Sequence, residues 1–338
     1  FANTTIRHIF EARDGNLWVG SQQGVMAMLP SDLRASEETI SGDAKGLRRW
    51  RGNGMNSAVE TSRGEIWIAH ARGIDVWSPQ PFQQIAAHRH LPTDRLSLVN
   101  ADVRSLWLDP SGWVWVGTFG GGLQRVNPQN EALYSRRLMP AIDTGLPQLN
   151  VLTVAQARAG GVWLGVAQYG FVRMDESLRI VERLPTPEHA NQPDQPSVPG
   201  EQPSAVVEST DGTLWLATDR GFFRRPAGQR KIESLPTSGF LEGASVRRLL
   251  PHPDGSPARG SFNAFVQATD GRWWIGSAFG LYQADSVGEA LTPIAMRSDV
   301  GDVHNNVAGL LVDQRGTLWM DASGLYRLNT LQSNEALF

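Results

Sequence analysis

A single tryptophan-centred phrase recurs seven times and accounts for nearly the whole chain of 338 residues. Most copies combine a glycine, an apolar–Trp–apolar triplet, a small residue and a second glycine, as in GTLWLATDRG. Successive tryptophans lie 49, 48, 48, 52, 59 and 45 residues apart, and they are Trp18, Trp67, Trp115, Trp163, Trp215, Trp274 and Trp319. Turn-bounded apolar runs with a period in the forties are typical of radial repeats. We therefore predict an all-β chain in which residues 1–338 form a single seven-bladed β-propeller.

Each repeat has the content of four antiparallel strands. In the third copy, turn residues separate strand-like runs at 103–109, 113–118, 123–128 and 132–138. A glycine three residues before each tryptophan suits a tight hairpin that needs a positive φ angle. Apolar residues on both sides of the tryptophan indicate a strand covered on both faces, and the small residue two positions later indicates close approach of neighbouring blades. The central tryptophans are therefore predicted to be structural.

Composition excludes several classes of function. A net charge of −3 gives no electrostatic case for a nucleic-acid partner or an anionic membrane surface. The chain has no cysteine, which removes thiolate metal sites and cysteine nucleophiles. It also lacks a run of about 18 apolar residues, so we predict no membrane insertion by this chain. No metal or other cofactor is predicted. Because Phe1 lies directly inside the first repeat, we interpret the chain as a piece of a longer protein.

The recurring phrase G-x-L-W-V/I-G-T/S-x-x-G closely resembles the repeat of the two-component regulator propeller family, and the resemblance covers all seven copies. It implies the periplasmic sensor region of a bacterial transmembrane receptor, a hybrid histidine kinase or a diguanylate cyclase. In such receptors an immunoglobulin-like sandwich, a membrane helix and an output domain follow the propeller, and none of these lies in this sequence. The implied partners are those downstream domains, with a homodimer among the arrangements to consider.

Candidate binding residues follow from the geometry of a blade. The turn after the second strand and the link to the next blade open on the same face, around the mouth of the central channel. The side chains in these turns differ between copies while the flanking residues do not, so the frame does not dictate them. We predict ligand contacts, to a small polar compound such as a carbohydrate fragment, from His70, Arg72, Phe119, Gln168, Tyr169, Asp219, Arg220, Phe279 and Asp321. Asparagines in the links, such as Asn56 and Asn100, are more typical of turn chemistry.

Two further features stay open at the level of sequence. The links at 184–203 and 249–262 are insertions in the repeat, and each fits a lid, a partner contact or a mobile linker. His88, His90 and Asp94 raise the question of a metal, but their irregular, arginine-rich segment favours solvated side chains. The run STDGTLW resembles the Asp box of sialidases with one spacer residue fewer, and Asp boxes are themselves structural. No recognisable catalytic motif occurs, so we predict that the chain is not an enzyme.

The sequence thus supports a periplasmic ligand-sensing propeller, in which a small ligand or a partner domain binds at the central mouth. One alternative is a dimerisation or docking scaffold that binds no small molecule. A second alternative is a propeller lyase or glycosidase. Neither the ligand nor the type of output domain can be read from these residues.

Overall fold

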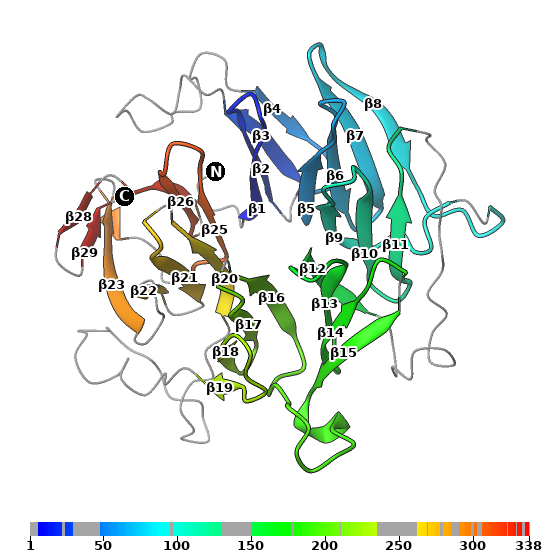
Figure 1. Ribbon diagram of the computed structural model, residues 1–338. Helices are drawn as coiled ribbons and strands as arrows, with labels where there is room; N and C mark the ends of the chain where they lie inside the picture. Colours follow the sequence, from blue (N-terminus) through cyan, green and yellow to red (C-terminus); the bar gives the residue numbers. More distant parts are fainter. Residues whose placement is uncertain are drawn as a thin grey trace, which may run out of the picture.

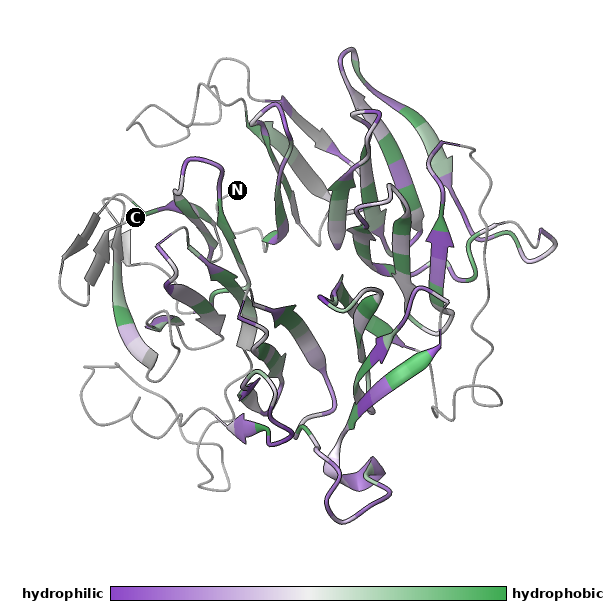
Figure 2. Cartoon of the chain, viewed as in Figure 1, coloured by the Kyte–Doolittle hydropathy of each residue, from purple (hydrophilic) through white to green (hydrophobic). Residues whose placement is uncertain are grey.

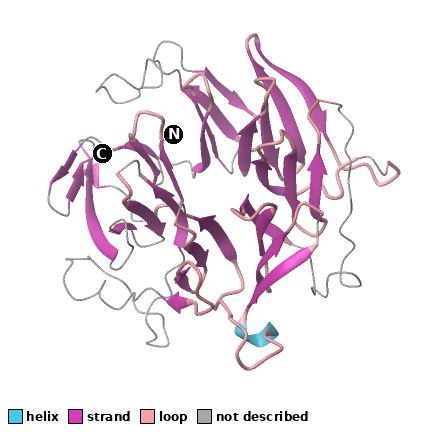
Figure 3. Ribbon diagram, viewed as in Figure 1, coloured by secondary structure: helices cyan, strands magenta, loops and turns pink. Residues whose placement is uncertain are grey.

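The computed structural model describes residues 6–21, 24–29, 48–94, 97–129, 150–177, 179–209, 211–234, 262–268, 270–277, 280–284, 291–298, 301–302, 306–322, 324–328, 330–332 and 335–337. Seven small sheets are arranged radially around a common axis, which is the predicted seven-bladed β-propeller (Figure 1). Apart from one 3₁₀ turn at Pro187–His189, the regular structure of the described residues consists of strands (Figure 3).

Within each blade the strands follow chain order from the axis outwards. Blade one contains β1 (Ile6–Glu11), β2 (Leu17–Ser21), β3 (Val25–Leu29) and β4 (Arg48–Arg51). Blade two contains β5 (Ser57–Glu60), β6 (Ile66–His70), β7 (Gly73–Pro79) and β8 (Phe82–His88). Blade three contains β9 (Val103–Leu108), β10 (Val114–Thr118) and β11 (Gly122–Val126). Blade four contains β12 (Val151–Gln156), β13 (Val162–Val166), β14 (Gly170–Met174) and β15 (Ile180–Pro185). The run predicted at 132–138 in the third blade lies outside the described residues.

The last three blades continue the pattern. Blade five contains β16 (Pro203–Glu208), β17 (Leu214–Thr218), β18 (Gly221–Arg225) and β19 (Glu233–Ser234). Blade six contains β20 (Phe262–Gln267), β21 (Trp273–Ser277), β22 (Gly280–Ala284) and β23 (Leu291–Ser298), with β24 (Gly301–Asp302) paired to β23. Blade seven contains β25 (Gly309–Val312), β26 (Leu318–Asp321) and β27 (Leu325–Arg327). The C-terminal hairpin, β28 (Thr330–Gln332) and β29 (Glu335–Leu337), extends blade six, because β29 pairs in parallel with β23.

The core lies between the blades rather than inside any one of them. Each of the seven central tryptophans is at most 5% exposed and packs in the cluster that joins its blade to the next. The residues on either side of each tryptophan point the other way, so that Val162 and Leu164 join the cluster with Trp115 of blade three. Alternation along a single strand therefore fills two interfaces. Figure 2 shows hydrophobic residues along the blades, whereas the loop after β15 is largely hydrophilic.

Two glycine positions of the repeat have the predicted roles. The seven glycines that precede the tryptophans by three residues all have φ angles between 77° and 87°, as the hairpins require. Two residues after the tryptophan, the small residue lets the next blade approach. A Cβ atom at Gly20 would lie 2.2 Å from Met55 Cβ, and one at Gly165 would lie 2.7 Å from Pro203 Cβ. Any larger side chain there would push neighbouring blades apart.

The ring closes where blade seven meets blade one. The innermost strands β1, β5, β9, β12, β16, β20 and β25 succeed one another around the axis, and β25 contacts β1. Trp319 of blade seven packs among Ile6, Leu17 and Leu29 of blade one. The backbone N–H of Gln314 donates to Glu11 Oε2 over 2.7 Å. Among the described residues, side chains make this closure, and no described strand pairs with both the first and the last blade.

Candidate ligand-binding mouth

Strand register places the predicted turns and links at one end of the propeller. The first residue of an inner strand pairs with the last residue of the second strand, as Val103 does with Thr118 and Val151 with Val166. The turn after each second strand therefore lies beside the link that enters each inner strand. We call this end of the propeller the mouth.

A β-bulge recurs at the mouth end of the inner strands. In five blades the register shifts between the first and third residues of the inner strand, so that one residue is left unpaired. A bulge releases that residue from the alternation of the strand and re-aims its side chain. The bulged residues, each eleven positions before a central tryptophan, are Arg7, Arg104, Leu152, Ser204 and Asn263.

Arg104 is held in place at the mouth from two sides. Its Nη2 lies 2.5 Å from Asp102 Oδ2 in an ion pair. Its guanidinium also lies over the ring of Phe119, 5.2 Å from the centroid. Phe119 is 43% exposed and its backbone N–H donates to the Asp102 carbonyl over 2.8 Å. A charged group, its counter-ion and an exposed aromatic ring thus form one rigid patch.

Arg7 belongs to the same electrostatic environment although it lies two blades away in sequence order. Burial lowers the pKa of Arg7, the positive charge of Arg104 lowers it further, and Asp102 opposes both effects. Arg7 belongs to blade one and Arg104 to blade three, and both occupy the bulge at the mouth end of their inner strands. Sequence reasoning missed both residues, since a bulge leaves no mark in a single strand. The available signal was the repeat phase, which places arginine eleven residues before the tryptophan in copies one and three.

His70, one of the predicted contact residues, lies in a buried network of blade two. The ring is 1% exposed, and its Nδ1 accepts a hydrogen bond from the backbone N–H of Arg72 over 3.0 Å. The Nε2 atom therefore carries the proton, and it lies 3.3 Å from Asp75 Oδ2. Burial alone would raise the pKa of Asp75, but hydrogen bonds from His70 and Arg89 outweigh it and lower the pKa to about 2. His70 is therefore buried within blade two, with Nδ1 hydrogen-bonded and Nε2 facing Asp75, while the side chain of Arg72 is exposed.

Tyr169 is also buried, beneath the long link that follows blade four. Its side chain is 5% exposed, its hydroxyl accepts a bond from Arg183 over 3.4 Å, and its ring lies 5.6 Å from that of His189. It therefore presents little surface to a ligand in this conformation. The neighbouring Gln168 is exposed and has a positive φ angle of 63°.

The other predicted residues differ in exposure. Arg220 is exposed, and Asp219 is half-buried with its Oδ1 accepting from the backbone of Gln202 over 3.0 Å. Asp321 is 0% exposed at the end of β26. Phe279 lies outside the described residues. Of the asparagines, Asn56 donates to the Val103 carbonyl over 2.8 Å, which is the structural role favoured for these residues.

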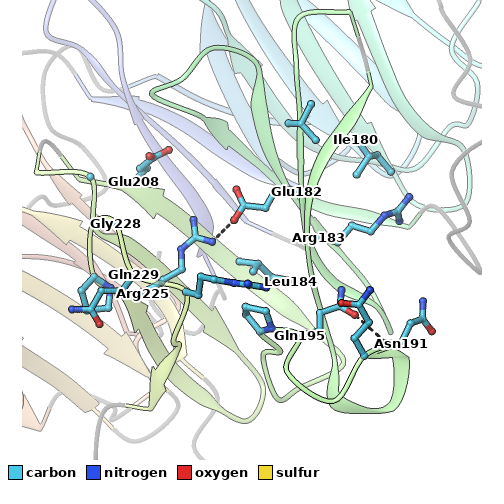
Figure 4. Close-up of a pocket in the computed structure, with 16 residues that line it drawn as sticks. Ile180, Glu182, Arg183, Leu184, Asn191, Gln195, Glu208, Arg225, Gly228 and Gln229 are labelled. Carbon is cyan, nitrogen blue, oxygen red and sulfur yellow. Dashed lines mark hydrogen bonds and ion pairs between the residues drawn. The ribbon is translucent and has the colours of Figure 1, made fainter.

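A second concavity lies at the rim between blades four and five (Figure 4). This groove of about 780 Å³ is bounded by β15, by the turn 226–230 and by part of the link at 184–203. Glu182 forms ion pairs with Arg225 and with Arg173, the latter at 3.2 Å. Glu208 accepts from the Arg158 backbone at 3.0 Å and from Trp163 Nε1 at 3.2 Å. The acidic groups of the groove are thus already engaged within the protein.

The side chains that raised the metal and Asp-box questions have partners within the fold. No group of three His, Asp or Glu side chains that could hold a metal ion occurs in the described part of the chain. His88 packs 4.8 Å from the ring of Trp67, and His90 Nδ1 lies 2.6 Å from the Leu98 carbonyl oxygen. In the segment like an Asp box, Asp211 accepts from Ser209 Oγ and from the Thr213 backbone, which stabilises the hairpin. Among the described residues, no helix is long and apolar enough to cross a membrane.

Comparison with known proteins supports the predicted resemblance. The family described as two component regulator propeller matches residues 1–23, which contain the first copy of the phrase except for its final glycine. The extracellular domain of a putative hybrid two component system from B. thetaiotaomicron has a TM-score of 0.70 and 16% identity, over 98% of this chain and 40% of that chain. The extracellular domain of a putative one component system from the same organism has a TM-score of 0.66 and 17% identity, over 97% and 39%. The predicted family resemblance is confirmed by these matches.

The same fold also occurs in an enzyme. A catalytically inactive virginiamycin B lyase from Staphylococcus aureus, solved with quinupristin, has a TM-score of 0.60 and 15% identity, over 96% of this chain and 94% of that chain. At such identities the likeness concerns the fold alone. The chain spans about two fifths of the two B. thetaiotaomicron proteins. No curated protein matches the sequence.

Proposed function

We propose that this chain, which carries a two component regulator propeller repeat, is the ligand-sensing propeller of a bacterial transmembrane signalling receptor and lies in the periplasm. Two kinds of similarity support the proposal: the repeat itself, and the fold shared with extracellular domains of two-component and one-component systems. The remaining parts of such a receptor, a sandwich domain, a membrane helix and an output domain, are proposed to be its partners.

The observation that carries the ligand-binding part of this proposal is the patch at the mouth. Arg104, Asp102 and Phe119 come together on a frame whose other positions are fixed by packing. Side chains that the fold does not need, at the open end of a rigid ring, are where a scaffold of this kind carries its binding function. Ligand binding is proposed to favour one arrangement of the propeller and downstream domains in a receptor dimer, which is a shift of populations.

A thermal-shift screen of the chain against sugars, oligosaccharides, amino acids and nucleotides tests ligand binding. A ligand at a hundred times its dissociation constant adds about 2.7 kcal/mol to the free energy of unfolding, which is readily detected. We expect the shift to be lost in Phe119→Ala and reduced by the pair Arg72→Ala and Arg220→Ala. The control is Arg315→Ala, since Arg315 is exposed in the hairpin between β25 and β26, at the opposite end of the blade from the mouth.

The receptor role has its own test. In the full receptor, the same mouth variants are expected to abolish the signalling response to the ligand. Normal signalling by variants that bind no ligand would leave the propeller as a docking or dimerisation scaffold. Turnover of the ligand by the purified chain would instead favour the lyase or glycosidase alternative. A full-length gene product without a membrane-spanning helix would contradict the proposal outright.

A further inference from the structure

The mouth carries more positive than negative charge at one place. Arg7 and Arg104 occupy the same bulge position in blades one and three, and Asp102 is the carboxylate that interacts with both. Two guanidinium groups at the same end of the ring repel each other, and this repulsion disfavours the empty mouth. One carboxylate offsets part of that repulsion, so a second anion would relieve the rest.

Arg104 is prepared for such a ligand. The ion pair with Asp102 and the contact with the Phe119 ring fix its guanidinium, so that little side-chain freedom remains to be lost on binding. A planar guanidinium donates two parallel hydrogen bonds to a carboxylate, phosphate or sulfate group. Arg7 is partly desolvated but still has surface open to solvent, and it offers a second set of donors.

We infer that the mouth binds an oxyanion, the carboxylate, phosphate or sulfate group of a small ligand, between Arg7 and Arg104 with Phe119 beside it. This assignment rests on the proposed function, in that it gives the ligand of the mouth a chemical class. The rim groove is a weaker candidate for an anion, because two carboxylates, Glu182 and Glu208, line it.

The test is calorimetric titration of the whole chain with inorganic phosphate, sulfate, glucuronate and, as the neutral comparison, glucose. We expect at least one anion to bind, more weakly as sodium chloride is added, and glucose to bind far more weakly than glucuronate. Arg7→Gln and Arg104→Gln should each weaken binding by about tenfold or more, the value of one charge-assisted hydrogen bond. Arg315→Gln is the matched control, since Arg315 is an exposed arginine in the hairpin at the opposite end of blade seven.

A variant that should strengthen anion binding distinguishes an electrostatic effect at the site from a general loss of structure. Asp102→Asn keeps an acceptor for Arg104 but removes the competing negative charge, so anion binding should become several times tighter. Misfolding of the patch would weaken binding in all three variants, and thermal unfolding of the unliganded variants reports that directly. The probe that binds best distinguishes a carboxylate ligand from a phosphate or sulfate ligand.

Three outcomes would overturn the inference. They are the absence of binding by any of the three anions at low salt, anion binding that both arginine variants retain, and equal binding of glucose and glucuronate. In the last case the proposed sensory function would survive with a neutral ligand. Conversely, anion binding that leaves receptor signalling unchanged would contradict the proposed sensory function but would support the anion site.

Discussion

Glutamate side chains form hydrogen bonds between neighbouring blades, and each lies seven residues before a central tryptophan. Glu11, Glu60 and Glu208 each accept a hydrogen bond from a backbone N–H in the first hairpin of the preceding blade, at 2.7, 2.6 and 3.0 Å. In two of these contacts the donor residue is an arginine, Arg13 or Arg158. Its guanidinium also donates to the backbone carbonyl of the residue that follows the glutamate. The third and seventh copies have Leu108 and Val312 at this position, and these side chains cannot accept a hydrogen bond.

Removing one of these glutamates should lower the free energy of unfolding more than removing an ordinary surface carboxylate. Glu208→Ala leaves the backbone N–H of Arg158 and the indole N–H of Trp163 without their acceptor. We expect the free energy of unfolding to fall by about 2 kcal/mol, as for partly buried unsatisfied donors. Urea denaturation measures it. Glu176→Ala, in an exposed turn of blade four, should change stability by less than about 0.5 kcal/mol, and equal effects of the two variants would contradict the assignment.

His8 makes the stability of the ring depend on pH. Burial lowers the pKa of His8 from its usual 6.5 to about 4. Below pH 6.5 the unfolded chain binds a proton on this ring, whereas the folded protein does not until about pH 4. The contribution of the neutral His8 ring to the free energy of unfolding is therefore complete above pH 6.5 and is lost as the pH falls towards 4.

The size of the effect follows from the interval of pH. At pH 5 His8 alone should lower the free energy of unfolding by up to about 2 kcal/mol relative to pH 7.5, less to the extent that the ring is still partly exposed. The measurement is urea denaturation at both pH values. In His8→Gln the difference between the two pH values should shrink by that amount, and an unchanged difference would assign the pH dependence to other groups.

The residues of the candidate site divide by how far away their partners lie. Phe119 could be placed at the mouth from its position in the repeat, because its exposure depends only on the local turn. Tyr169 could not, since the link residue His189 covers it, and His70 could not, since Arg89 and Asp75 complete its network. Contacts between segments that no repeat relates are invisible to a repeat-based prediction.

At the scale of elements, the long link after β15 is anchored rather than loosely attached. Val198 is 0% exposed, packs with Trp163 and Leu184, and donates its N–H to the Pro185 carbonyl over 2.8 Å. The 3₁₀ turn at Pro187–His189 is held by Thr186 Oγ1, which lies 2.9 Å from His189 Nδ1. Its proline-rich sequence left a lid, a contact and a mobile linker equally open. The buried Val198 argues against the mobile linker, and burial of a single residue in a polar segment has no periodic signal. The other insertion, at 249–262, lies outside the described residues except for Phe262.

Trimming Val198 tests this anchoring. Val198→Ala should lower the free energy of unfolding by about 2 kcal/mol, from two lost methyl groups and the cavity they leave. Residues 186–202 should also become faster to exchange amide hydrogens and easier for a protease to cut. Val181→Ala, on the exposed side of β15, should do neither. Unchanged exchange in the Val198 variant would mean that the link is held elsewhere.

At the scale of the whole molecule, the repeat determines the ring, but not the way in which the ring closes. Seven similar phrases predict seven blades, and each tryptophan needs a following blade to bury it. For Trp319 that blade is the first one, so the burial of a tryptophan that forms each interface also closes the ring. In the seventh copy, only the tail at 335–338 has a composition that suits a fourth strand. In the structure that tail serves blade six instead, through β29 and β23.

Because Trp319 closes the ring and the tail does not, replacing Trp319 should destabilise the protein more than removing the tail. Trp319→Ala should lower the free energy of unfolding by about 3–5 kcal/mol, because it empties the interface of blades seven and one. A chain ending at Leu328 loses β28 and β29 but keeps that interface, so it should remain a folded ring with a smaller loss. Calorimetry and hydrogen exchange of blade one compare them: opening the ring should expose Ile6 and Leu17 in the tryptophan variant only. If the shortened chain were to expose blade one as well, the C-terminal hairpin would be part of the closure after all.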